Sequence, residues 1–386
     1  MGKRVYFDWN ATAPLRAEAR VAAMRALDGA ANASSVHREG RAARQLIERA
    51  REQVATLAGA RPEGVTFTSG ATEANILALT PFLEVVGQKL PRDRLFISAI
   101  EHPSVLSGGR FAPQAVETLP VTADGVIDLA ALAAALGKAE RPLVSIMLAN
   151  NETGVIQPIA AIAEIVHLAN GLLHVDAVQG AGRIDCDIMA LGADLMSLSA
   201  HKLGGPQGVG ALIRRDGIHI GASLLTGGGQ ERGLRAGTEN VAGIAGFGAA
   251  CAIAASTRQM DADRMTRLRD QFEAELIAVV PQAVIFGANA ARLPNTTLVA
   301  VPGIKAETAI ISFDLNGIAV SSGAACSSGK IQASGVLDAM AVEPALARGA
   351  VRVSLGWSTT EADVDKLLNA WKHVVSSLLK RQANAA

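Results

Sequence analysis

Short apolar runs rich in β-branched residues alternate with Ala-rich stretches of helical periodicity over the first two thirds of the chain. Such alternation predicts an α/β domain in which helices cover both faces of a mostly parallel sheet. A continuous run such as LVSIMLA is typical of a strand that is buried on both sides. The expected strands are residues 65–69, 94–100, 143–149, 172–178, 194–200 and 209–215. The expected helices are residues 16–27, 39–58, 71–86, 128–137, 159–170 and 240–255.

The pattern changes after residue 256, where a charged helical stretch begins. Further strands are expected near residues 296–301, 318–320 and 351–355, followed by a final helix at 361–380. A chain of 386 residues is long enough for more than one domain. We therefore expect a large domain over residues 15–256 and a smaller domain formed by residues 1–14 and 257–386.

Composition narrows the class of protein. Lysine and arginine together number 36, as do aspartate and glutamate, and this balance argues against direct nucleic-acid binding. The three cysteines, Cys186, Cys251 and Cys326, are too widely separated for a disulfide framework, and no CxxC pair indicates zinc. We expect reduced cysteines, no resident metal, and a soluble, cytoplasmic protein, because neither a secretory signal nor a membrane-spanning segment is evident.

Two of the expected strands end in residues suited to a flat cofactor. Strand 194–200 leads into Lys202, and desolvation frees the lone pair of a lysine amine for Schiff-base formation. Strand 172–178 carries Asp176, followed by Gln179, which can hold a cationic ring nitrogen and a phenolic oxygen. Taken singly, each has an ordinary alternative: a lysine that reaches solvent, or an aspartate that caps a helix.

Two further strand ends carry TSGATE (68–73) and Glu101-His102-Pro103-Ser104. Backbone N–H groups and hydroxyls at a helix N-terminus form a phosphate site, although Ser69 and Thr72 also suit an ordinary capping box. Pro103 favours extended backbone at His102, whose ring can stack on a cofactor and move protons. Ligands of open α/β sheets bind beyond the carboxyl ends of the strands, so the four ends together predict one shared site.

These motifs resemble those of the NifS/IscS-type cysteine desulfurases, within the class V aminotransferase group of fold-type I enzymes that use pyridoxal 5′-phosphate (PLP). The resemblance runs from FDWNATAP at 7–14 to VRVSLG at 351–356. Its other markers are NASSVH (32–37), FTSGATEAN (67–75), EHPS (101–104), NNETGVIQP (150–158), DAVQ (176–179), SAHKLGGPQGVG (199–210), GGGQERGLRAGTEN (227–240) and SSGAAC (321–326). It implies the fold of a PLP-dependent transferase: an α/β large domain whose central sheet is mostly parallel, and a smaller α+β C-terminal domain.

The resemblance also implies roles for individual residues. Catalysis is assigned to Cys326, Lys202 and His102, and Lys202 carries the cofactor. Cofactor binding is assigned to Ala71, Thr72, His102, Asn151, Asp176, Gln179, Ser199, His201, Lys202 and Thr238. In relatives, the residue at the position of Thr238 reaches the phosphate of the partner subunit, which implies a homodimer.

Substrate binding is assigned by the same resemblance to Arg352, Asn151 and Asn10. The planar fork of Arg352 suits a carboxylate better than a lysine would. Trp9 departs from the family pattern, in which asparagine is usual. We therefore expect Trp9 to reshape the entrance or the substrate subsite.

Cys326 lies in SSGAACSSGK, a run with little apolar surface, so we expect a mobile loop with a functional thiol. Cys186 and Cys251 lie in apolar settings typical of buried cysteines. By resemblance, L-cysteine gives L-alanine and a persulfide on Cys326, and the sulfur passes to an Fe–S scaffold or another acceptor protein. The thiol then lies near an Fe–S cluster only on such a scaffold partner.

Three alternatives stay open on the sequence. A class V aminotransferase or a selenocysteine lyase shares the same cofactor motifs, but an aminotransferase has no need for Cys326. A catalytically inactive homologue that serves as a binding scaffold is the third. The retention of Lys202, Asp176 and His102 argues against an inactive chain.

Overall fold

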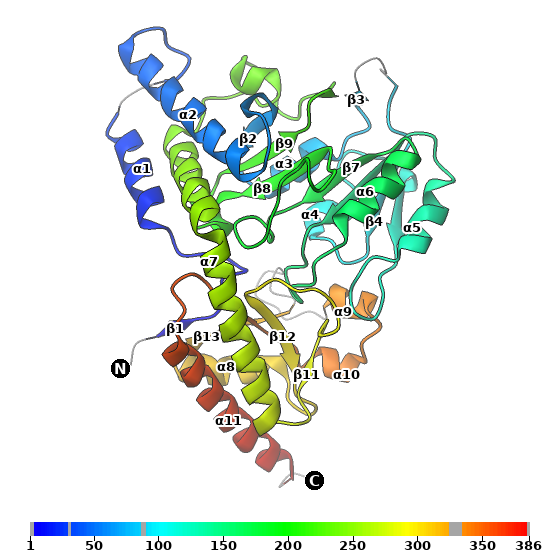
Figure 1. Cartoon of the computed structure of the whole chain (residues 1–386), viewed down its shortest axis with the longest axis vertical. Helices are drawn as coiled ribbons and strands as arrows, with labels where there is room; N and C mark the ends of the chain where they lie inside the picture. The colour runs from blue at the N-terminus through cyan, green and yellow to red at the C-terminus, as the bar shows by residue number, and fades with distance from the viewer. Residues whose placement is uncertain (1–3, 30–31, 86–89, 324–333, 384–386) are drawn as a thin grey trace.

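The computed structural model describes residues 4–29, 32–85, 90–323 and 334–383. Within these ranges the strands form a seven-stranded sheet, a four-stranded sheet and two two-stranded sheets. Figure 1 shows the large sheet and its helices in the upper half of the molecule, and the smaller sheet below it. The expected α/β architecture is confirmed.

The seven-stranded sheet positions the site. Its order is β2-β9-β8-β7-β6-β4-β5. The strands are β2 (Val65–Thr68), β4 (Arg94–Ser98), β5 (Val116–Leu119), β6 (Pro142–Met147), β7 (Leu172–Asp176), β8 (Leu195–Ser199) and β9 (Gly210–Arg214). In this sheet β9 pairs antiparallel with both β2 and β8, and the other pairs are parallel. Because β9 runs opposite to both of its neighbours, β2 runs in the same direction as β8 and therefore as β7, β6, β4 and β5.

Helices cover both faces of this sheet. Side chains alternate between the faces along each strand, so apolar residues on both faces need covering. Met196 and Leu198 of β8 belong to a cluster with the apolar side of α2, whereas Leu195 packs with Leu77 on the α3 side. The helices are α1 (Ala17–Leu27), α2 (Arg38–Leu57), α3 (Ala71–Ala78), α4 (Pro103–Leu106), α5 (Leu129–Leu136) and α6 (Ile159–Leu168).

The expected helix over 71–86 is wrong in its length. Helix α3 ends at Ala78, and residues Leu83–Val85 form strand β3, which pairs with β10 (Ile218–Ile220). Pro81 explains the stop, because proline disfavours helical backbone at the residue before it and cannot donate an N–H to the helix.

The second unit is built on the four-stranded sheet, in the order β11-β12-β15-β14. Its core includes Phe7, Val353, Phe313 and Trp371, and the last two rings meet edge-on at 5.0 Å between centroids. The strands are β11 (Val284–Ile285), β12 (Thr296–Ala300), β14 (Ser321–Ser322) and β15 (Val351–Ser354), with β1 (Val5–Tyr6) paired to β13 (Ile318–Ala319). The helices are α8 (Ala306–Leu315), α9 (Gly335–Ala339), α10 (Pro344–Ala347) and α11 (Glu361–Ala383).

Helix α7 (Val241–Val279) joins the two units without a break. Phe247 belongs to the core of the large sheet, whereas Phe272 belongs to the core of the second unit. By length and composition alone α7 is apolar enough to cross a membrane, but half of its most apolar window is buried inside the protein. The expected domain boundary at residue 256 lies inside this helix, as Figure 1 shows. The proposed division into domains stays a prediction.

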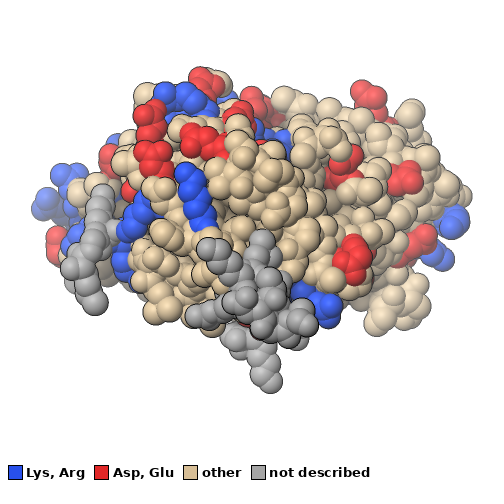
Figure 2. Space-filling model, turned by 90° about the horizontal axis from the view of Figure 1, so that it is seen from below, with Lys and Arg blue, Asp and Glu red and all other residues tan. Residues whose placement is uncertain are grey.

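The surface carries both signs of charge. On the face seen from the end of the second unit, Lys and Arg are interspersed with Asp and Glu among broad uncharged areas (Figure 2). This agrees with the zero formal net charge of the chain.

The N-terminal segment is fixed to the end of β15 by aromatic packing. Trp9 is only 3% exposed, meets Trp357 edge-on at 4.6 Å between centroids, and donates its indole N–H to the carbonyl of Tyr6. Gly356 lies against the face of the Trp9 ring, and a Cβ at this position would overlap the ring. Trp9 therefore requires glycine at position 356.

We predict that Gly356→Ala lowers the free energy of unfolding by about 1–3 kcal/mol, the usual cost of overpacking a core. Urea denaturation measures this change. Gly137→Ala is the matched control, because its Cβ would meet only the carbonyl oxygen of Ala134 at 3.6 Å. Equal stability of the two variants would contradict the packing argument.

Candidate active site

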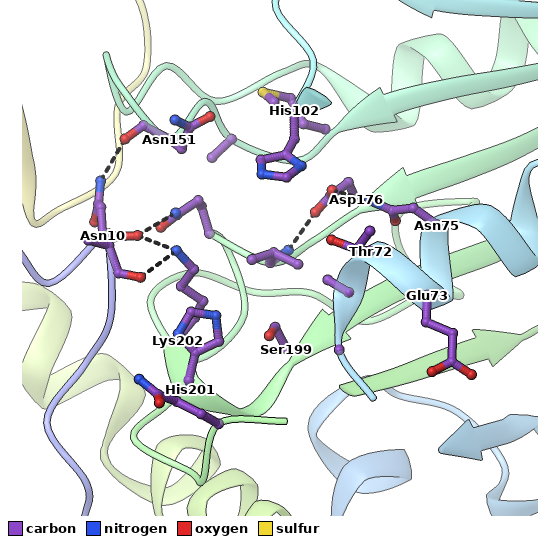
Figure 3. Close-up of a pocket in the computed structure, with 18 of the residues that line it drawn as sticks. Asn10, Thr72, Glu73, Asn75, His102, Asn151, Asp176, Ser199, His201 and Lys202 are labelled. Atoms are coloured by element: carbon purple, nitrogen blue, oxygen red, sulfur yellow. Dashed lines mark hydrogen bonds between the residues drawn. The ribbon is translucent and has the colours of Figure 1, made fainter. Parts of the chain in front are cut away.

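The carboxyl ends of β2, β4, β7 and β8 surround a cavity of about 510 Å³. Its wall is completed by Asn10 and Ala11 from the N-terminal segment and by Arg352 from β15. Figure 3 shows the labelled side chains around this space. The sequence-predicted residues that line it are Asn10, Ala71, Thr72, His102, Asn151, Asp176, Gln179, Ser199, His201, Lys202 and Arg352.

Lys202 ends the short helix η3 (Ala200–Lys202), which follows β8 directly. The chain then turns through Gly204, whose φ of +80° favours glycine. The amine Nζ donates to the carbonyl of Asn10 at 2.5 Å and to that of Ala11 at 2.8 Å. The fold thus holds the amine at the wall of the cavity.

Asp176 is a buried carboxylate, 5% exposed, at the end of β7. One oxygen accepts from the side-chain amide of Asn75 at 2.9 Å, and the other accepts from the backbone N–H of Val178 at 3.1 Å. The Asn75 amide also donates to Ser104 Oγ at 2.9 Å, which links Asp176 to the His102 loop. Asn75 lies within the FTSGATEAN motif, but no sequence pattern indicates that its side chain contacts Asp176.

His102 caps α4 and faces the cavity. Its Nδ1 accepts from the backbone N–H of Ser104 at 3.2 Å, so the proton of the neutral ring lies on Nε2. Burial and, to a lesser extent, the nearby Lys202 lower the pKa of His102 below its ordinary value, against the opposing charge of Asp176. The ring is therefore neutral at neutral pH and presents an N–H donor.

A second group of polar atoms lies around the N-terminus of α3. Gly70 precedes the helix, and a Cβ there would meet nothing within 4 Å, so the space in front of the helix is open. Thr72, Ser199 and His201 line the cavity together with these backbone N–H groups. Burial, with the charge of Lys202, lowers the pKa of His201 to about 4, which makes it neutral.

Arg352 is 2% exposed on β15. Its Nη2 pairs with Asp8 at 2.7 Å, and its Nη1 donates to the carbonyl of Asn151 at 3.1 Å. Its Nε is buried without a hydrogen-bond partner among the described residues. A buried guanidinium with an unused donor beside a cavity suits a carboxylate ligand. The partner Asp8 was not singled out from the sequence.

Asn10 lines the cavity, but its side chain is occupied elsewhere. Its amide donates to the carbonyl of Asn151 and to Thr296 Oγ1, and its oxygen accepts from Asn295. These bonds tie the N-terminal segment to both units. The expected contact of Asn10 with substrate stays a prediction.

Two predicted site residues do not line the cavity in the described part of the chain. Thr238 lies in a neighbouring cavity of about 230 Å³, together with Ser69 and Arg235. Cys326 lies outside the described residues.

Trp9 is not among the residues that line the cavity, and the expectation that it reshapes the entrance or the substrate subsite stays a prediction. Its ring packs on Trp357 and Gly356. The indole N–H is bonded to the Tyr6 carbonyl, which holds the ring in that position.

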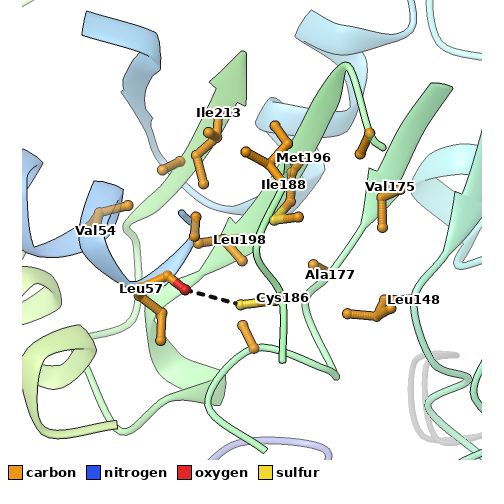
Figure 4. Packing of buried hydrophobic residues seen from close by; sticks show 14 of the residues in the cluster. Val54, Leu57, Leu148, Val175, Ala177, Cys186, Ile188, Met196, Leu198 and Ile213 are labelled. Carbon is orange, nitrogen blue, oxygen red and sulfur yellow. Dashed lines mark hydrogen bonds between the residues drawn. The ribbon is translucent and has the colours of Figure 1, made fainter. Parts of the chain in front are cut away.

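The two described cysteines are buried and free. Cys186 packs among apolar residues such as Leu198 and Ile188, and its thiol donates to the carbonyl of Leu57 (Figure 4). Burial raises the pKa of Cys186 to about 12 and raises that of Cys251 as well. Neither thiol is poised to react as a thiolate.

A family model described as aminotransferase class-V matches residues 5–367. The chain belongs to the class-V aminotransferase family. The cysteine desulfurase IscS of Dictyoglomus turgidum is 39% identical over 382 residues, covering 98% of this chain and 96% of that protein. A cysteine desulfurase of Cereibacter sphaeroides is 41% identical and covers 97% of each chain. The X-ray structure of a NifS-like protein from Rickettsia africae matches with a TM-score of 0.87 at 37% identity, covering 97% of this chain and 99% of that one.

This class-V enzyme depends on PLP, and the residues of the cavity fit that cofactor. The amine of Lys202 suits the aldehyde, and the oriented carboxylate of Asp176 suits the ring nitrogen. The open space before α3, faced by the backbone N–H groups of its first turn and by the hydroxyls of Thr72 and Ser199, suits the phosphate.

We predict that Asn75→Leu weakens PLP binding by roughly ten- to hundred-fold. The change leaves one buried oxygen of Asp176 without a donor, at a cost of about 1–3 kcal/mol. Titration of the cofactor-free protein with PLP, followed by visible absorbance, measures the affinity. Ser107→Ala, which removes a hydroxyl bonded only to the Ser104 carbonyl, is expected to bind normally. An unchanged affinity in Asn75→Leu would show that this contact does not support the cofactor.

We predict that the imidazole of His102 titrates below pH 6.5, its ordinary pKa, because burial disfavours the charged ring. The ring stays neutral as the pH falls from 7 and gains its second proton only below pH 6.5. Nuclear magnetic resonance of protein labelled at histidine Cε1 measures the midpoint, and the signal that His102→Gln removes identifies the residue. A midpoint at or above 6.5 would contradict the proposed burial of the ring.

Proposed function

We propose that the protein is a PLP-dependent cysteine desulfurase that moves sulfur from L-cysteine to Cys326, releasing L-alanine. The observation that carries the proposal is the meeting of Lys202, Asp176, His102 and Arg352 around one cavity. Relatives named cysteine desulfurase that align over nearly the whole chain support the same reaction.

Arg352 binds the carboxylate of the substrate in this proposal. Its free Nε and one Nη form the planar fork that carboxylates prefer, while Asp8 holds the guanidinium in place. Asn151 lies beside it and offers a side-chain amide to the same substrate. The substrate α-carbon is thereby directed toward Lys202.

Lys202 holds the cofactor and then serves as the base that removes the α-proton of the substrate. PLP, when bound, supplies the electron sink that makes this proton removable, with Asp176 against its ring nitrogen. His102 stacks on the ring and donates through Nε2, because Ser104 already occupies Nδ1. Ala71, Thr72, Ser199 and His201 hold the phosphate.

Cys326 receives the sulfur. Its thiolate attacks the substrate sulfur, the carbon–sulfur bond breaks with its electron pair passing to carbon, and carbon takes up a proton to give alanine. The sulfur remains as a persulfide on Cys326. From Cys326 the sulfur passes to an acceptor protein.

The acceptor that we propose is an Fe–S assembly scaffold, in the cytoplasm. Similarity to the IscS protein of Dictyoglomus turgidum supports this assignment. We further propose a homodimer. Thr238 lies outside the main cavity of its own chain, and the nearby Leu225, which bridges to Arg235, is exposed, as expected near a partner subunit.

We predict that Cys326→Ala abolishes alanine release from L-cysteine and leaves the visible absorbance of bound PLP unchanged. The reason is that sulfur then has no acceptor thiol, although the cofactor site is intact. Mass spectrometry of wild-type protein incubated with cysteine should place the added sulfur on the Cys326 peptide.

Cys186→Ala is the matched control, since this thiol is buried away from the cavity. Cys186→Ala should retain turnover, and after incubation with cysteine it should carry as much added sulfur as the wild-type protein. Full turnover in Cys326→Ala would instead favour an aminotransferase or a lyase that needs no thiol.

A further inference from the structure

Arg183 is a buried cation that contacts Gln179, and no sequence pattern pointed to it. It is 7% exposed, in the turn that follows β7. One guanidinium nitrogen donates to the side-chain oxygen of Gln179 at 2.5 Å and to its carbonyl at 2.8 Å. The other donates to the carbonyl of Trp9 at 3.4 Å.

No carboxylate forms an ion pair with Arg183 among the residues that the structure describes. Burial, with the like charge of Arg352, lowers the pKa of Arg183 to about 10, so the guanidinium is still charged at neutral pH. A buried charge without a counter-ion is costly, and proteins retain one mainly where it acts on a ligand or a catalytic group.

The charge fixes the orientation of the Gln179 amide. A guanidinium can only donate hydrogen bonds, so the amide must turn its oxygen toward Arg183. The amide nitrogen then donates to the carbonyl of Asn10 at 3.0 Å and has a second N–H left. Gln179 lines the cavity, so this N–H is the polar group that it can offer to a ligand there.

We propose that Arg183 is a positioning residue that locks Gln179 as a hydrogen-bond donor toward the phenolic oxygen of PLP and adds positive potential at that oxygen. The inference rests on the proposed contact of Gln179 with the cofactor. A flipped amide would place its NH₂ group against the guanidinium, which the two sets of donors disfavour.

The consequence concerns the protonation of the bound cofactor. A donor and a nearby positive charge stabilise the anionic phenolic oxygen and weaken its hold on the neighbouring nitrogen proton. The visible absorbance band of the resting holoenzyme reports this proton. With Arg183 in place, the band should therefore change at lower pH than it would without the charge.

The test is a pH titration of the visible band of the holoenzyme, without substrate, for wild type and Arg183→Met. We expect the midpoint of Arg183→Met to rise by about one pH unit, the usual effect of removing a close charge. Arg183→Lys, which keeps the charge and one donor, should return the midpoint toward the wild-type value.

Arg92→Met is the matched control. Arg92 is also buried, 3% exposed, and donates to the carbonyls of Leu83 and Asn170. It precedes β4, at the amino end of the strand, whereas the cavity lies at the carboxyl ends. It should lose stability without shifting the midpoint. A midpoint shift in Arg92→Met equal to that in Arg183→Met would overturn the proposal, because the effect would then be merely structural.

An unchanged midpoint in Arg183→Met would also overturn it. Gln179→Leu separates this failure from that of the cofactor assignment itself. If Gln179→Leu raises the midpoint and Arg183→Met does not, Gln179 contacts the cofactor but Arg183 does not position it. If neither variant moves the midpoint, the assignment of Gln179 to PLP is wrong as well.

Discussion

The shared direction of β2, β4, β7 and β8 is the constraint on which the site depends. Each strand ends at the same edge of the sheet, so the loops that follow them meet in space although they are far apart in the sequence. The reversed β9 matters here, because β2 keeps the common direction only through its two antiparallel pairings. Without that arrangement the N-terminus of α3 would lie at the opposite edge from Lys202.

The electrostatics of the cavity follow from burial. The two lining histidines are held neutral, and burial raises the pKa of Glu101, beneath the His102 loop, to about 8. Two charged groups of the lining are oriented by dedicated partners, Asp176 by Asn75 and Arg352 by Asp8. Such preorganised groups need little rearrangement when a charged ligand binds.

The sequence predicted the strands of the large sheet well where apolar runs were continuous. The edge strand β5 was not predicted, because Val116–Leu119 is short and half exposed. The continuity of α7 was also not predicted. Its first half is apolar because it is enclosed between α1, α2 and the sheet, and its second half is amphipathic because it covers only one core. A change in composition therefore resembled a boundary between domains.

The residues at the strand ends were predictable because glycine, proline and reactive side chains cluster there. The supporting residues Asn75, Asp8 and Arg183 were not predicted, since each acts through a contact between segments distant in sequence or through a turn whose shape the letters do not specify. Sequence patterns report periodicity and local turns, and contacts of this kind depend on the completed tertiary structure.

The unbroken path of α7 has a mechanical consequence. Bending a continuous helix would sacrifice backbone hydrogen bonds along its length, so the helix acts as a rod that sets the spacing of the two cores. Lys202 follows β8 of the large sheet, and Arg352 lies on β15 of the second unit. In the proposed reaction, the fixed gap between amine and guanidinium sets the distance from the α-carbon to the carboxylate of the substrate, which all amino acids share. Residues other than Lys202 and Arg352 must therefore distinguish one amino acid from another.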